Sequence, residues 1–216
     1  MMMLCCRRRK GLLRKMAGGS LFFIVTHLCA RGTAPLSYDI DYFHMFTQTG
    51  SFPLFVSNVY ASKLFVSARY SYDIQDVLCL NGGYIFYVKG SPDKKIIPTF
   101  GLLADRMTGV TPGMQINLLY PRLVVTSINQ VMVDVRTHRY LNNAYNWNEF
   151  NYIVKDYFRP GIVTLEQFFW NNRKASYVSL GPTLFGHVYK FNYFIYSFDL
   201  WKNSRWFLIG FNYAFP

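Results

Sequence analysis

Short segments with large apolar residues at every second position recur from Leu36 to the end of the chain. Alternation over about ten residues is typical of β-strands, because successive side chains point to opposite faces. None of these segments has a helical period with capping residues, so the predicted class is all-β. The twelve predicted strands are 36–46, 54–62, 64–74, 77–88, 95–105, 111–120, 122–135, 143–155, 157–169, 176–188, 190–199 and 205–215.

The connections between these strands alternate in length. The short ones lie near Lys63, Pro121, Asp156 and Tyr189. The longer, polar ones are 47–53, 106–110, 136–142, 170–175 and 200–204. Two connections break the rule, a long one at 89–94 and a short one near Gln75. Short turns on one rim and long loops on the other indicate an antiparallel up-and-down transmembrane β-barrel of about 12 strands, with 10 possible.

The last strand shows the alternation most clearly. Its odd positions are large and apolar or aromatic, and we expect them to face lipid: Phe207, Ile209, Phe211, Tyr213 and Phe215. The even positions Gly210, Asn212 and Ala214 are small or polar, which suits a crowded lumen. A terminal aromatic strand of this kind also predicts the barrel-assembly machinery as a partner, although Pro216 follows Phe215 here.

Polar residues also recur in the middle of the predicted strands. We expect them to face the lumen, because the bilayer penalises charged side chains on the lipid face by about 2–4 kcal/mol. These candidates are Arg69, Asn81, Gln115, Asn117, Gln130, Glu149 and Glu166. They form either a hydrogen-bonded plug or the lining of a narrow aqueous channel. Twelve strands enclose a wider lumen than eight, which favours the channel.

The first thirty residues have the character of a signal peptide. A basic run from Arg7 to Lys15 precedes the short apolar stretch 16–29, and cleavage after Ala30 would begin the mature chain at Arg31. The predicted organisation is therefore a signal peptide over 1–30 and an outer-membrane barrel over 31–216. Cys79 is then the one cysteine left, so no intramolecular disulfide is expected.

The net charge of +12 does not predict nucleic-acid binding. Six of the 23 basic residues lie in the first fifteen positions, which leaves 17 basic against 11 acidic residues from Arg31 onward. These charges are spread along the sequence, whereas a nucleic-acid surface needs a basic stripe.

Aromatic residues near the predicted strand ends suggest two interfacial girdles. Trp147, Trp170, Trp201 and Trp206 would mark the long-loop rim, because amphipathic rings favour the headgroup boundary. The short-turn rim would carry Tyr120, Tyr157 and Tyr189. Outer-membrane lipid is the environment that this arrangement predicts.

Catalysis and metal binding find little support in the sequence. Acyl hydrolysis needs a serine close to a histidine that an acid or amide orients, and His44, His138 and His187 have no distinctive serine or acidic neighbour. From Arg31 onward, three scattered histidines and one cysteine show no metal-ligand spacing, so no metal and no cofactor is predicted. An outer-membrane lipid hydrolase and a soluble periplasmic β-sandwich or lipocalin-like binder remain the alternative hypotheses.

Several short motifs occur in a characteristic order. They are the runs 68–73, 82–86, 111–113, 146–150 and 158–161. In this order and spacing the chain resembles small, largely uncharacterised outer-membrane β-barrel proteins of Bacteroidota type, over about residues 60 to 215. The resemblance implies a barrel and an outer-membrane address, and no catalytic or binding residue is carried over from it. The predicted function is a small-solute channel or a structural or surface barrel, with no enzymatic activity.

Overall fold

The computed structural model describes residues 36–71, 76–136 and 141–215. The strands are β1 (Leu36–Thr47), β2 (Gly50–Ala61), β3 (Leu64–Tyr70), β4 (Val77–Tyr84), β5 (Phe86–Val88), β6 (Ser91–Asp105), β7 (Gly109–Leu119), β8 (Leu123–Asp134), β9 (Asn143–Tyr152), β10 (Arg159–Phe169), β11 (Tyr177–Val188), β12 (Phe191–Phe198) and β13 (Trp206–Phe215). A single turn of 3₁₀ helix, η3 (Arg173–Ala175), precedes β11. Within the described residues, no helix is long and apolar enough to cross a membrane. The predicted signal peptide over 1–30 lies outside the described residues.

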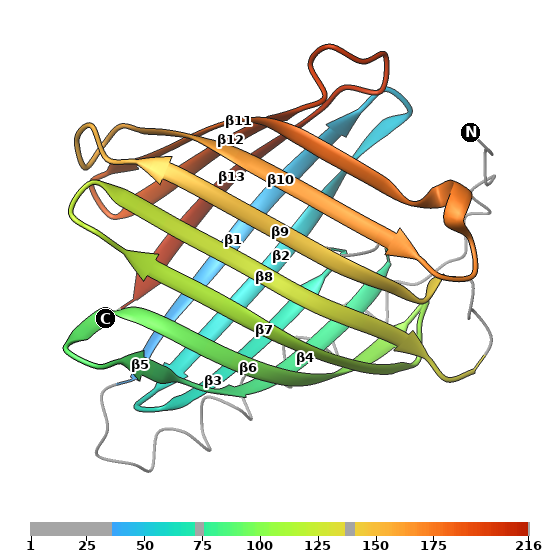
Figure 1. Cartoon of the computed structure of the whole chain (residues 1–216), viewed down its shortest axis with the longest axis horizontal. Helices are drawn as coiled ribbons and strands as arrows, with labels where there is room; N and C mark the ends of the chain where they lie inside the picture. Colours follow the sequence, from blue (N-terminus) through green and yellow to red (C-terminus); the bar gives the residue numbers. More distant parts are fainter. Residues whose placement is uncertain (1–35, 72–75, 137–140, 216) are drawn as a thin grey trace.

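The strands form one closed antiparallel barrel (Figure 1). Apart from β4 and β5, which both pair with β6, each strand pairs with its neighbours in the chain, and β13 pairs with β1. The short β5 is the continuation of β4, because Gly83 opposite Thr99 and Phe86 opposite Ile96 keep the same register across Ile85. Counted as one strand, β4 and β5 make this a barrel of twelve strands, as the sequence predicts. A single closed sheet rules out the two-sheet sandwich.

The two ends of the barrel differ. We call the end that carries residues 36 and 215 the terminal rim, and its connections are 62–63, 89–90, 120–122, 153–158 and 189–190. The opposite end is the loop rim, with connections 48–49, 71–76, 106–108, 135–142, 170–176 and 199–205. Both expected exceptions disappear, because 89–90 is short and 71–76 is longer. Two other connections differ from the prediction: 48–49 is shorter, since β2 begins at Gly50, and 153–158 is longer, since β9 ends at Tyr152.

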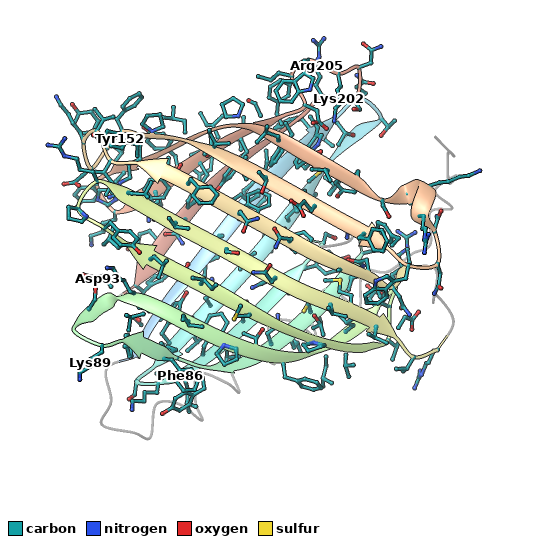
Figure 2. All side chains as sticks on the ribbon, viewed as in Figure 1. Phe86, Lys89, Asp93, Tyr152, Lys202 and Arg205 are labelled. Carbon is teal, nitrogen blue, oxygen red and sulfur yellow. The ribbon has the colours of Figure 1, made fainter. Side chains whose placement is uncertain are left out.

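The outward faces of most strands are largely apolar. Exposed large residues occur at alternate positions, as with Ile40 and Tyr42 on β1 or Phe100 and Leu102 on β6. The predicted lipid-facing residues of β13 share one parity, and Phe207, Ile209 and Phe211 are exposed. Figure 2 shows that labelled charged side chains gather at the rims instead, Lys89 and Asp93 at the terminal rim and Lys202 and Arg205 at the loop rim. An apolar belt between charged rims is the exterior of a transmembrane barrel.

Two of the tryptophans do not join the expected girdle. Trp147 is buried inside the barrel, where its ring meets those of Tyr196 and Phe198 edge-on. Trp206 also lies on an inward position and stacks on Phe198 with 3.8 Å between ring centroids. Both rings therefore contribute to the interior. The other girdle candidates are exposed at the rims, namely Trp170, Trp201, Tyr120, Tyr157 and Tyr189.

Candidate functional site

The lumen holds six of the seven polar residues that the sequence singled out. Five of them are buried at inward positions of their strands, namely Arg69, Asn81, Gln115, Gln130 and Glu149. Asn117 has the same parity as Gln115 on β7, so it also points inward, and it is opposite Lys95 of β6. These residues do not belong to one sequence motif. They come together in space because the barrel closes.

Glu166 lies on the outer face, and the prediction that it lines the lumen is wrong. On β10 the buried positions are Val163, Leu165 and Gln167, so Glu166 is exposed and points away from the lumen. The inward side chain at this level is Gln167, which donates to the Asn143 side chain at 3.2 Å.

One half of the lumen wall, from β3 to β8, is polar and carries small residues. Its buried polar residues are Ser67, Arg69, Asn81, Thr99, Thr111, Gln115 and Gln130. The guanidinium of Arg69 donates to the Gln130 side chain and, through Nε, to Ser67 Oγ at 3.4 Å. Gln130 in turn donates to Thr111 Oγ1 at 3.3 Å. The Arg69–Gln130 bond joins β3 to β8, which are not neighbours in the sheet, so it crosses the lumen.

Beside Arg69 lies a cavity of about 80 Å³. Its lining combines charged and apolar residues: Asp41, Phe43, Val56, Asn58, Arg69, Gln115 and Ile128. A polar cavity of this size has room for several water molecules. The Oδ1 atom of Asn81, at another inward position, has no hydrogen-bond partner among the described atoms, so water is the partner open to it.

A second polar group lies toward the terminal rim on β11, β12, β13 and β1. Asn212 donates to Asp41 Oδ1 at 2.6 Å and accepts from Asn192 Nδ2 at 2.7 Å. Asn192 Oδ1 lies 2.9 Å from His187 Nδ1. A chain of side-chain hydrogen bonds therefore runs across four strands and ends at the cavity that Asp41 shares with Arg69. Nearby, Asn58 donates to Asp39 Oδ1 at 2.7 Å.

Asp39 and Asp41 are lumen residues that the sequence reading missed. They alternate with Ile40 and Tyr42, whose side chains are exposed on the outside. The alternation in β1 was itself a sufficient signal, because acidic residues at every second position of a membrane strand belong on the inner face.

Apolar side chains from β1, β2, β9, β10, β12 and β13 form a central cluster that joins opposite walls of the lumen. This central cluster consists of Phe43, Leu54, Val56, Tyr145, Trp147, Val163, Leu165, Tyr196, Phe198 and Leu208. Glu149 is buried at its margin, where the carboxylate accepts from Asn151 and, at 3.2 Å, from the Tyr196 hydroxyl. The polar half is thus the part of the lumen where a solute path can run.

Two smaller apolar clusters lie at the ends of the polar half. Near the loop rim are Val77, Cys79, Leu103, Met107, Met132 and Leu141. Near the terminal rim are Phe65, Ile85 and Ile97, with Tyr60 against them. Hydrophobic constrictions can close a pore to water and ions even where polar walls lie between them.

The described histidines are not placed for acyl transfer. His44 points outward and lies 3.0 Å from the Tyr42 hydroxyl, while His187 meets Asn192. Neither has a hydrogen-bonded serine in the described structure, and His138 lies outside the described residues. Across the residues that the structure covers, no group of three or more acidic, histidine or cysteine side chains could hold a metal ion.

Structural comparison finds the same barrel fold in a protein of known structure. The KdgM porin aligns with a TM-score of 0.61 and 11% sequence identity, covering 82% of this chain and 99% of the porin. The structure of the KdgM porin in complex with disordered oligogalacturonate aligns with the same values. At this identity the likeness shows the fold. No protein-family model matches the sequence, and no curated protein matches it.

Proposed function

We propose that this protein is an outer-membrane channel for small polar solutes. The observation that carries the proposal is the polar half of the lumen, where Arg69 and Gln115 line a cavity together with Asp41. A barrel that needed only to be stable in lipid could fill its interior with apolar side chains, as it does in the central apolar cluster. Buried charges and amides have a clearer use where water and solute pass.

The narrow lumen limits the solute to small molecules or ions. Arg69 is only 3% exposed, so the lumen around it is tightly packed. The side chains of the two apolar clusters, around Met132 and around Ile97, would have to move apart before a solute could pass. An oligogalacturonate, as bound by the KdgM porin, fits this lumen poorly, because Asp39, Asp41 and Glu149 offset the inward basic residues.

Delivery to the outer membrane would follow the ordinary route for barrels. The proposed signal peptide over 1–30 directs export, and the barrel-assembly machinery recognises the aromatic strand β13. The intact mass of protein from envelopes should lack about the first thirty residues. Full-length protein in the cytoplasm would contradict this part of the proposal.

The test is conductance in planar bilayers, with substitutions matched for charge. Arg69→Gln should shift ion selectivity toward cations, because a charge in a narrow, low-dielectric pore acts strongly on passing ions. Lys202→Gln removes the same charge at the loop rim and should leave selectivity nearly unchanged. If Arg69→Gln does not fold, Asp41→Asn, which removes an acidic group from the same cavity, tests the same reasoning with the opposite sign.

A closed structural barrel is the second candidate, and the central apolar cluster favours it. It predicts no conductance from the wild-type protein and a lower melting temperature for both lumen variants. Loss of lipid hydrolysis on replacing His44 or His138 would instead support the enzyme alternative.

A further inference from the structure

The outer face of β8, β9 and β10 carries an island of polar residues. It consists of two rows across the three strands, Ser127, Asn148 and Thr164 in one, and Asn129, Asn146 and Glu166 in the other. The three strands lie side by side on the near wall of the barrel (Figure 1). The inward neighbours Tyr145, Trp147 and Leu165 are apolar and buried, so the polarity of the wall is inverted here.

Apolar residues enclose this island on all four sides. Across the strands, the rows continue into Ile116 and Met114 on β7 and into Leu180 and Val178 on β11. Along the strands, the next outward residues are Val125, Phe150 and Ile162 on one side and Val131, Ala144 and Phe168 on the other. The island therefore lies within the apolar belt and is separate from the charged rims.

No other part of the described outer wall has this composition. Among outward strand positions of the described residues, the three asparagines and the single carboxylate all belong to the island. Lipid chains cannot supply hydrogen bonds, and an unsatisfied polar group in hydrocarbon is costly. A group of this kind in a membrane strand needs a polar partner.

The island satisfies only part of its own hydrogen-bonding capacity. Ser127 donates to Asn148 at 2.7 Å, Asn129 donates to Ser127 at 2.9 Å, and Asn146 donates to Asn129. Both amide hydrogens of Asn148 are used, toward Asn146 and Thr164. Asn129 and Asn146 each keep one N–H, and the Glu166 carboxylate has no hydrogen bond or ion pair within the described part of the chain.

We propose that the outer face of β8–β10 is the interface between two copies of this chain. The spare donors lie on β8 and β9 and the spare acceptor on β10, so the surface complements itself. A two-fold axis along the membrane normal sets the β10 edge of one copy against the β8 edge of the other. The Glu166 carboxylate then meets the partner's asparagine strands instead of a second carboxylate.

This proposal rests on the membrane location given above. Cysteine variants test the dimer by crosslinking and the membrane location by labelling. Asn146→Cys, on the central strand of the island, should form a disulfide-linked dimer in membranes on mild oxidation. Phe55→Cys is the control, because it is exposed on β2, across the barrel from β9. It should crosslink no more than the parent protein. A lipid-soluble maleimide should label it and a water-soluble one should not, which checks the location independently.

Substitutions in the island test the hydrogen bonds themselves. The double variant Asn129→Leu, Glu166→Leu should lower the dimer association constant at least about tenfold in nanodiscs or mild detergent. Glu166→Gln keeps the size and acceptor and should retain the dimer. A monomeric wild type, equal crosslinking of the two cysteine variants, or an Asn146→Cys adduct with a different protein would each overturn the proposal.

Discussion

An arginine in place of Phe211 tests the lipid-facing side of the barrel directly. Phe211 lies in the middle of β13, between Tyr42 of β1 and Tyr193 of β12, and is 52% exposed on the outside. A basic side chain at the midplane of a membrane barrel costs about 2–4 kcal/mol. At about 1.4 kcal/mol per factor of ten, Phe211→Arg should lower the folding equilibrium constant by about thirty- to several hundredfold.

Urea unfolding of the protein folded into lipid vesicles, followed by tryptophan fluorescence, measures this cost. Phe211→Leu should be much milder, because it keeps an apolar group facing lipid. Leu200→Arg places the same charge at an exposed position of the loop rim, where the cost should fall to about 0–1 kcal/mol. If Phe211→Arg were no more destabilising than Leu200→Arg, the outer face of β13 would not lie in hydrocarbon.

Three further predictions concern the interior and the strand contacts. Asn212→Ala removes the bonds to Asp41 and Asn192 and should destabilise the barrel by about 1–3 kcal/mol, measured by the same urea unfolding; a silent variant would contradict the hydrogen-bond chain. Gly181→Ala should block folding, seen as loss of the folded band in gels of unheated samples, because the new Cβ would overlap the Ser197 carbonyl; Gly82→Ala has open space and should fold. Met132→Ala, in the loop-rim cluster, should raise single-channel conductance, and an unchanged conductance would remove that cluster from the path.

The strand order and closure could be read from the sequence because they depend on period and length. β13 is the simplest case, since its outward residues are all large and its inward ones are mostly small or polar. The segment 77–88 was likewise expected as one strand, and the shared register of β4 and β5 agrees. Strand ends were less accurate: β3 ends at Tyr70, and β9 ends at Tyr152, because residues 153–158 connect it to β10.

The lumen could be predicted only where its polarity contrasts with that of the outer face. Arg69 and Gln115 lie on strands whose outward residues are apolar, so the assumption that polar residues face inward placed them correctly in the structure. The pairing of Arg69 with Gln130 across the barrel could not be read from the sequence. That contact depends on closure of the sheet, and the two residues are far apart in the chain.

Glu166 marks the place where this assumption fails, and the cause lies inside the barrel. Val163 and Leu165 belong to the central apolar cluster, so β10 needs apolar residues on its inner face as well as beside lipid. A strand that is apolar on its inner face as well as beside lipid no longer alternates simply between apolar and polar residues. The few polar residues in such a strand then lie on the outer face. Parity alone cannot reveal such an inversion, because it requires knowing which wall the apolar cluster occupies. This inversion explains why the sequence wrongly predicts an inward Glu166. It also concentrates amides and a carboxylate on the outer face of β8–β10, where a second protein surface can form hydrogen bonds with them and lipid cannot.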